Sequence, residues 1–243
     1  MDNFYRFLDG ARLMDMHFKN ASFDLNMPVI LAMLSIYYTN FYNVQSQAII
    51  CYGDKLTHFT DFVRQLHMES LGKKTKIDGS PVNVNTGNVI WGGSGSDGQH
   101  SYFQLLHQGS YTIPIDFIVD AGVSDDQMDT YSLANCLAQS ESLMAGMQEA
   151  DPERSIDGDK PNNVVLVNKL SPQSIGQLVS LYEHKVFVQS VIYGINAFDQ
   201  YGVELGKKIA QSLSKVISKS SRYTGKNLST RALLSKIKEY RKG

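Results

Sequence analysis

The sequence predicts an α/β fold in which a parallel sheet is covered by helices. Short apolar runs of strand length alternate with longer helical patterns along most of the 243 residues. This alternation is typical of parallel strands joined by helices. The composition, 42% apolar and 19% charged, is that of an ordinary globular protein. The length is enough for one large domain or two small ones with a substantial core.

Helical patterns dominate the first seventy residues. Residues 3–18 carry apolar side chains at helical spacing, and residues 26–42 are apolar almost all round, with an asparagine cap and a proline in the first turn. A helix that is apolar on every side is a buried helix. Residues 48–52 then predict a short buried strand, and residues 55–68 predict an amphipathic helix.

The alternation continues after a polar stretch at residues 70–88. A serine followed by proline at residue 172 is a strong helix start. The expected elements are, in chain order, strand 88–91, a glycine-rich loop, helix 99–108, strand 113–119, helical residues 126–149, a turn-rich linker at 150–163, strand 164–170, helix 171–193, helix 202–218 and a basic helix at 228–241.

Charge is distributed unevenly along the chain. The formal net charge of −1 gives no general attraction to nucleic acid or membranes. From Lys207 onward, however, there are eleven Lys or Arg and a single acid, Glu239. A basic tail can bind anions or RNA, but the simpler interpretation is two amphipathic helices with solvated basic faces. We therefore expect no nucleic-acid partner.

The cysteines and the apolar runs bear on the cellular compartment. Cys51 and Cys136 stand in apolar contexts without paired spacing, which indicates neither a disulfide framework nor a zinc site. The first ten residues, MDNFYRFLDG, contain acids where a signal peptide has basic residues. The run MPVILAML is far too short to span a bilayer. These features predict a cytoplasmic protein without membrane contact.

The segment WGGSGSDGQH (91–100) contains G-x-G-x-x-G at Gly93, Gly95 and Gly98, and the next apolar run ends at Asp120. This spacing resembles a dinucleotide-binding fingerprint. The fingerprint normally opens a domain, however, and about ninety residues precede it here. Alternatively, the glycines form a sharp turn that presents His100 at the start of a helix, where the dipole favours a neutral acid–base imidazole. His100 is otherwise simply a polar residue at a helix N-terminus.

Two other segments offer candidate functional side chains. QLHMESLGKK places Glu69 just past an amphipathic helix, where a carboxylate in partly apolar surroundings is a candidate base; the alternative is a solvated loop residue. FDQYGVELGKK places Gln200 and Lys207 around a turn. We expect Lys207 to share a helix face with Glu204, three residues away, and Lys208 to face water. The histidines lack metal-ligand spacing, so no metal is expected.

A series of long segments then connects these residues. In chain order they are FLDGARLMDMHF, MPVILAMLSIYYTNF, RQLHMESLGKK, WGGSGSDGQHSYFQLLHQG and SPQSIGQLVSLYEHKVFVQSVIYGINAFDQYGVELGKK. Together they resemble the glucose-6-phosphate isomerase (phosphoglucose isomerase) family, in the family's own order, from about residue 4 to about residue 218. The resemblance implies a three-layer SIS-type (sugar isomerase) domain and reversible isomerisation of glucose 6-phosphate to fructose 6-phosphate, without metal or cofactor.

The resemblance also implies roles for individual residues. Glu69 of MES matches the base that moves a proton between C2 and C1 through a cis-enediol(ate). His100 of GQH matches the ring-opening histidine, and Lys207 of ELGK matches the lysine that assists at the ring oxygen. Gln65 and Gln200 match glutamines that line the sugar-phosphate site. In the family the histidine reaches the neighbouring subunit, which implies a homodimer.

The sequence departs from the family pattern in one large respect and several small ones. Ser94 to Asp97 stand where Pro-Gly-Thr-Asn is frequent, Leu71 replaces a usual Asn, and the region between about 121 and 163 is shorter than in many relatives. The family's N-terminal signature G-G-R-[FY]-S, with its arginine, is absent, as is the Ser/Thr-rich loop that grips the phosphate. The resemblance therefore implies a C-terminal half.

In that half, we expect residues 1–200 to form most of the second SIS-type domain and residues 201–243 the C-terminal helices. Without the phosphate loop and the arginine, we expect the isolated chain to be inactive or nearly so. The alternative function is a non-catalytic module that binds sugar phosphates.

Overall fold

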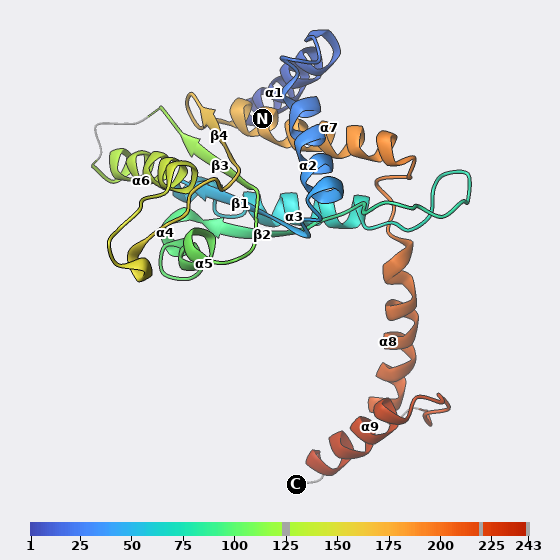
Figure 1. Ribbon diagram of the computed structural model, residues 1–243. Coiled ribbons are helices and arrows are strands. Elements are labelled where there is room, and N and C mark those ends of the chain that lie inside the picture. The colour runs from blue at the N-terminus through green and yellow to red at the C-terminus, as the bar shows by residue number, and fades with distance from the viewer. Residues whose placement is uncertain (123–126, 219–220, 242–243) are drawn as a thin grey trace. The chain divides into compact units, whose positions relative to one another are not determined.

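The computed structural model describes residues 1–122, 127–218 and 221–241. Within them, four parallel strands form one sheet in the order β2-β1-β3-β4 (Figure 1). The strands are β1 (Ser46–Tyr52), β2 (Val89–Ser94), β3 (Ile115–Asp120) and β4 (Asn162–Val167). The predicted parallel α/β fold is confirmed.

Helices cover both faces of this sheet, because the side chains of β1 alternate between two apolar cores. Ile49 and Cys51 join one core, with side chains from α1 (Asp2–Asn20), α2 (Met27–Phe41), α3 (Phe59–Leu71) and α7 (Pro172–Tyr193). Ala48 and Ile50 join the opposite core, with α5 (Phe103–Gln108) and α6 (Gln127–Ala145). A strand buried on both faces is expected in a parallel sheet covered by helices. The result is a three-layer structure.

Helices α1 and α7 pack at backbone contact. A Cβ added at Gly10 would lie 1.8 Å from the carbonyl oxygen of Gln173, and a Cβ at Gly176 would lie 2.0 Å from that of Phe7. Neither position has room for a larger side chain. The close approach is reinforced by a hydrogen bond of 2.8 Å from the Gln173 amide to Asp9, a residue 164 positions away. The first and last helices of the layer are thereby joined.

Most predicted elements are confirmed, although several of their boundaries differ from the expected ones. The helix expected at 55–68 begins only at Phe59, after a short 3₁₀ turn η1 (Asp54–Leu56), and continues to Leu71. The helix expected at 99–108 begins only at Phe103, as α5, and a separate single turn, α4 (Gly95–Gly98), lies within the expected glycine-rich loop. Residue 126, the first of the helical stretch expected at 126–149, lies outside the described residues, and α6 ends at Ala145.

A buried ion pair lies between the sheet and α7. Asp116 of β3 is 0% exposed, and Lys185 of α7 is 1% exposed, with 3.6 Å between Lys185 Nζ and Asp116 Oδ2. The carboxylate also accepts hydrogen bonds from Gln47, Tyr182 and Asn163, at 3.0, 3.2 and 2.9 Å. Burial lowers the pKa of the Lys185 ammonium, and the Asp116 charge counteracts this. The Asp116 carboxylate thus accepts three side-chain hydrogen bonds inside the protein, and Lys185 Nζ donates one to Gln47 Oε1 at 3.2 Å.

His67 of α3 is a second buried titratable group. Its side chain is 1% exposed, and its Nε2 has no hydrogen-bond partner among the described residues. Burial, and secondarily the charge of Lys185, lowers the pKa of His67 from 6.5 to about 3. The imidazole is therefore neutral in the folded protein at physiological pH.

This depressed pKa predicts an acid sensitivity of the fold. Below the unfolded-state pKa of about 6.5, the unfolded chain binds a proton at His67 and the folded chain does not, so the free energy of unfolding falls with pH until about 3. The expected contribution is about 2 kcal/mol between pH 7.5 and pH 5. Urea titrations of a His67→Leu variant should show a pH dependence weaker by that amount. His58→Leu, at a side chain 91% exposed, is the control and should leave it unchanged.

The contacts of the chain divide it into two units, Met1–Phe198 and Asp199–Gly243. The second unit contains the 3₁₀ turn η3 (Tyr201–Val203), α8 (Glu204–Ile217) and α9 (Leu228–Tyr240). Asn227 caps α9 by accepting a hydrogen bond of 2.9 Å from the Thr230 amide. The assignment of residues 1–200 as an SIS-type domain and 201–243 as appended helices stays a prediction.

Candidate functional site

Glu69 and Gln65 lie on the same face of α3, one helical turn apart. Gln65 Nε2 donates to Glu69 Oε2 at 3.4 Å. Glu69 is half-buried and Gln65 is exposed. The sequence-based placement of Glu69 beyond the helix is wrong, because α3 continues until Gly72 ends it. The carboxylate is consequently held on a rigid helical backbone rather than on a loop.

Lys73 fixes the end of this helix. Its Nζ donates to the carbonyl oxygens of Glu69 and Ser70, at 2.7 and 3.0 Å. An ammonium group at a helix C-terminus satisfies carbonyls that have no partner within the helix and offsets the negative end of the dipole. The sequence analysis did not single out Lys73, although its place directly after Gly72, the glycine that ends the helix, was an available signal. Lys73 thus stabilises the backbone from which Glu69 projects.

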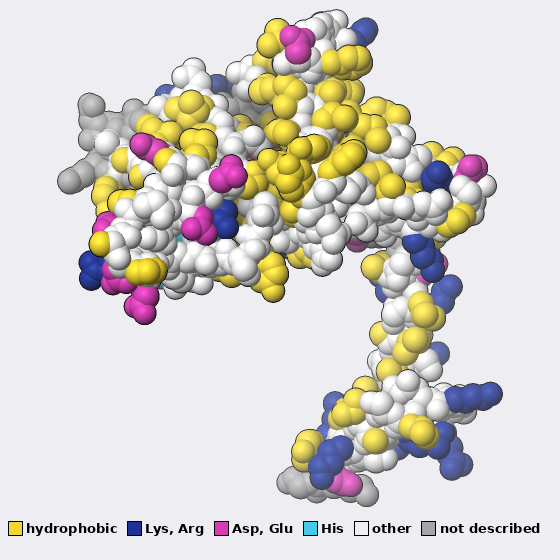
Figure 2. All heavy atoms as spheres, viewed as in Figure 1, with side chains coloured by type: hydrophobic (Ala, Val, Ile, Leu, Met, Phe, Trp, Pro, Cys, Tyr) yellow, Lys and Arg dark blue, Asp and Glu magenta, His cyan; other side chains and the backbone are white. Residues whose placement is uncertain are grey.

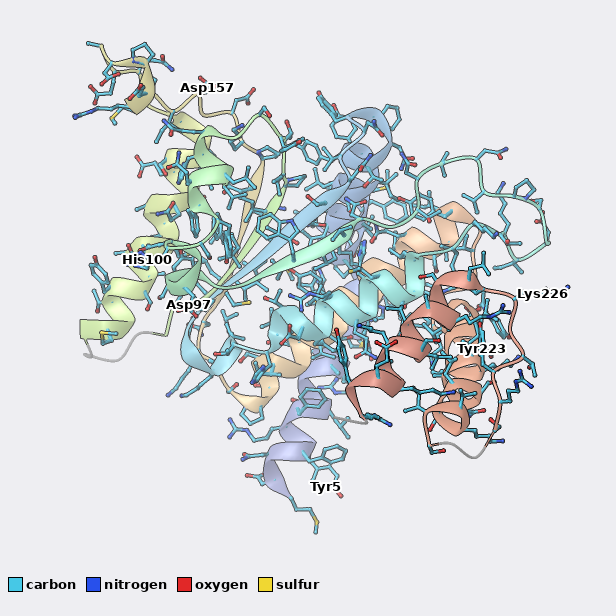
Figure 3. The ribbon with its side chains drawn as sticks, turned by 90° about the horizontal axis from the view of Figure 1, so that it is seen from below. Tyr5, Asp97, His100, Asp157, Tyr223 and Lys226 are labelled. Carbon is cyan, nitrogen blue, oxygen red and sulfur yellow. The ribbon has the colours of Figure 1, made fainter. Side chains whose placement is uncertain are left out.

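His100 lies in a turn between α4 and α5, not at the start of a longer helix as predicted. Its backbone amide donates to the carbonyl oxygen of Asp97 at 3.2 Å, and its side chain is exposed. Ser94 caps α4 by accepting a hydrogen bond from the Asp97 amide at 3.4 Å. Figure 3 shows Asp97 and His100 close together in the loop that follows β2. The helix-dipole argument for a neutral His100 consequently has no support, because α5 begins three residues later.

Two glycines of the G-x-G-x-x-G pattern serve to pack tyrosine rings. A Cβ at Gly95 would lie 2.3 Å from Tyr52 Cζ, and a Cβ at Gly98 would lie 2.6 Å from Tyr102 Cζ. Tyr102 is half-buried, burial raises its pKa to about 12, and its hydroxyl donates to the carbonyl oxygen of Ser94 at 3.4 Å. The strand before the loop, β2, also stands at an edge of the described sheet, whereas the dinucleotide fingerprint follows a central strand. These features favour a packed loop over a dinucleotide site.

Within one chain, Glu69 lies near the amino ends of the parallel strands, whereas His100 lies beyond their carboxyl ends. Because β1 and β2 are parallel, the connecting α3 returns from the carboxyl end of β1 to the amino end of β2. The end of α3 lies beside the start of β2: a Cβ at Gly87 would be 3.2 Å from the carbonyl carbon of Leu71. His100, by contrast, follows the carboxyl end of β2. One chain therefore does not bring this carboxylate and this imidazole together.

Gln200 and Lys207 belong to the second unit. Gln200 precedes η3, Lys207 lies in the first turn of α8, and both are exposed. Glu204 Oε2 is 3.8 Å from Lys208 Nζ, four residues along the helix, and the Lys208 side chain is 74% exposed, as expected for a lysine that faces water. The i,i+4 spacing aligns these two side chains along the helix axis. Lys208 thus faces water and forms an exposed ion pair with Glu204.

Among the candidate residues, Glu69 and His100 offer acid–base chemistry. In residues 1–122, 127–218 and 221–241, no group of three His, Cys, Asp or Glu could hold a metal ion. No helix in the same ranges is long and apolar enough to cross a membrane. A carboxylate on a helix and an imidazole in a turn are side chains that can accept or donate protons.

The fold and these groups define a three-layer α/β protein with side chains suited to proton transfer. A family model described as "Phosphoglucose isomerase" matches residues 1–234, and the chain belongs to the phosphoglucose isomerase family. It is 44% identical to a glucose-6-phosphate isomerase of Pseudomonas fluorescens (strain SBW25) over 266 aligned residues, which cover 100% of this chain and 48% of the relative. The corresponding protein of Francisella tularensis subsp. tularensis (strain FSC 198) is also 44% identical, over 98% of this chain and 48% of the relative.

Solved structures agree with this assignment. A glucose-6-phosphate isomerase from Chlamydia trachomatis superimposes with a TM-score of 0.86 at 32% identity, covering 98% of this chain and 46% of that one. A hypothetical protein from Thermus thermophilus shares the fold, with a TM-score of 0.66 at 20% identity, covering 85% of this chain and 49% of that one. The chain spans about half the length of the curated relatives it matches.

Proposed function

We propose that this chain is the C-terminal half of a glucose-6-phosphate isomerase, which interconverts glucose 6-phosphate and fructose 6-phosphate. The observation that carries the proposal is the family match across residues 1–234, within which Glu69 stands half-buried on a rigid helix beside Gln65. A proton transfer between adjacent sugar carbons needs one carboxylate held over both of them. The half-buried position of Glu69 and its contact with Gln65 support this role.

The remaining steps have candidate residues as well. Opening of the sugar ring needs a base for the anomeric hydroxyl and an acid for the ring oxygen, and we assign His100 and Lys207 to this step. Gln200, with Gln65, would bind the sugar phosphate. The negative enediolate also needs a cation, which in the family comes from the G-G-R-[FY]-S arginine that this sequence lacks.

We propose that the active site forms in a homodimer, with His100 supplied by the neighbouring subunit. The positions of Glu69 and His100 at opposite ends of the strands support this arrangement.

Two free and buried cysteines, Cys51 and Cys136, support the cytoplasmic location predicted from the sequence.

Subunit mixing tests the exchange of His100. In the reconstituted enzyme described below, Glu69→Gln and His100→Asn should each be nearly inactive. If the histidine crosses the interface, a mixed dimer has one intact site and one doubly altered site, so randomly mixed subunits should recover about a quarter of the parental activity. If both groups act within one chain, the mixture stays as inactive as its components, and the assignment of His100 to the partner is wrong.

An apolar surface supports the requirement for a second half of the enzyme. Large apolar side chains gather over α1, α2 and α7 (Figure 2). Phe23, Val191 and Ile192 are 80%, 61% and 50% exposed there. These residues border a groove of about 980 Å³, also lined by Met33 and Phe187. A contiguous apolar patch of this kind usually marks a protein interface.

We infer that the occupant of this apolar α1–α2–α7 surface is the N-terminal half of the family enzyme. The relatives contain about as much chain again as this one, which is enough polypeptide to cover it.

Reconstitution tests the proposed function. The isolated chain should show little or no isomerase activity in a coupled assay, because it lacks the phosphate loop. Joining it to the N-terminal half of the Pseudomonas fluorescens relative should produce turnover. In the joined protein, Val191→Glu should reduce activity by at least about tenfold, since an unpaired charge would be buried at the interface. Leu137→Glu, at a residue of α6 that is 48% exposed, is the matched control and should have little effect.

The outcomes separate the two functions. Family-like turnover by the isolated chain would show that the second half is unnecessary. A joined protein that folds and binds the sugar phosphate without isomerising it would favour the non-catalytic module, for which the absent phosphate loop is the supporting feature.

A further inference from the structure

The second unit contains a cavity with a basic rim. It has a volume of about 390 Å³ and lies between the last turn of α8, the segment before α9, and α9 itself. Val216 and Leu234 form its apolar wall and are 2% and 7% exposed. Arg222, Arg231 and Lys238, all exposed, also line it. Three cations from two segments therefore surround one small space.

The charge of this rim is not neutralised by nearby acids. From Lys207 onward Glu239 is the single acid of the sequence, and its Oε2 is engaged by Lys236 Nζ at 2.8 Å. Arg231 donates one Nη2 bond of 3.4 Å to the Gly225 carbonyl oxygen, which orients its guanidinium group. A guanidinium has five N–H donors, so most of those of Arg231 can serve a ligand. The cavity has the positive charge and the donors that an anion requires.

We propose that this cavity binds a small phosphate-bearing anion. Arginine presents donors in a planar fork that matches phosphate oxygens, and bonds between charged partners are stronger than neutral ones. Tyr223 also lines the cavity and adds a hydroxyl group. A small cavity with an apolar wall suits a small ligand, whereas single-stranded nucleic acid is bound along an extended groove with stacked aromatic side chains. The basic tail is then a specific site rather than only a solvated surface.

The cavity is distinct from the proposed catalytic lysine. Lys207 lies in the first turn of α8, and Val216 lies in the last. At 1.5 Å per residue the two positions are roughly 13 Å apart along the helix axis. The proposal consequently does not depend on the isomerase activity, and the two can fail separately.

Calorimetric titration of the full chain with inorganic phosphate tests the proposal. We expect one site per chain, with Arg222→Gln and Lys238→Gln each weakening binding by about tenfold, as for the loss of a charge-assisted hydrogen bond. Arg222→Gln leaves the Arg231–Gly225 bond in place, and circular dichroism should confirm the fold. Lys226→Gln is the matched control, because Lys226 is exposed in the same segment and points away from the helices (Figure 3). A parallel titration with glycerol phosphate distinguishes a free phosphate from a phosphate ester as the ligand.

Three results would overturn the proposal. Equal weakening by Lys226→Gln and Arg222→Gln would show diffuse charge attraction. Loss of binding in Lys207→Gln alone would place the phosphate at the proposed active site. Tight binding of single-stranded RNA without detectable phosphate binding would make the tail a nucleic-acid surface.

Discussion

Replacing Glu69 by Gln in the reconstituted enzyme should lower kcat by about 10²–10⁴-fold, the usual contribution of a general base. The amide keeps the size of the side chain and its ability to bond with Gln65 but cannot take a proton from a sugar carbon. KM should change little, because the phosphate and most hydroxyl contacts are made elsewhere. Coupled-assay kinetics at several substrate concentrations separate the two effects.

The control is Glu141→Gln, which removes the same charge from an exposed position on α6. It should leave both constants unchanged. Parental turnover in Glu69→Gln would exclude the carboxylate as the base, and a large rise in KM with unchanged kcat would make it a binding residue instead. Either result would sink the mechanism, although not the family assignment.

The second large effect is expected on stability. Lys185→Met should lower the free energy of unfolding by about 3–5 kcal/mol, because it leaves the Asp116 carboxylate charged and buried without its cation. Methionine fills a similar volume, so the loss reports the charge rather than a cavity. Urea unfolding at neutral pH measures it, and Lys169→Met, at an exposed lysine, should cost less than about 0.5 kcal/mol.

A double variant identifies the cause. If the unpaired charge is responsible, adding Asp116→Asn to Lys185→Met should recover part of the lost stability, since the amide can still bond with Gln47 or Asn163. If the double variant loses more free energy of unfolding than the two single variants lose together, the pair acts through packing.

Sequence reasoning was most successful where one feature determined the structure. The apolar pattern of residues 26–42 predicted the helix α2, and the serine and proline at 171 and 172 marked the start of α7. The expectation that α2 is buried on every side is wrong for this chain, because Met33 and Phe41 are 50% and 77% exposed. Sequence reasoning failed where contacts between side chains distant in sequence determine the local structure. The turn that divides α4 from α5 depends on the rings of Tyr52 and Tyr102 packing on glycines, and periodicity contains no such information.

The site shows the same division. Gln65 and Glu69 were four residues apart in a helical pattern, so their contact was predictable, and Gly72 was an available stop signal that would have placed Glu69 inside the helix. Asp116 stood in the apolar run IPIDFIV, which indicates a buried acid in need of a partner. Its cation lies 69 residues further on, among several lysines, and only the fold selects it.

The backbone contact between α1 and α7 has a consequence for biosynthesis. The two helices are connected by bonds spanning 164 to 169 positions, including that from His184 to Asp15, and such non-local contacts form slowly. At the usual translation rate of about 5–20 residues per second, α1 would wait roughly 10–30 s for its partner to leave the ribosome. During that interval its apolar stripe is available to chaperones. Folding of this layer is thereby delayed until most of the chain has been made.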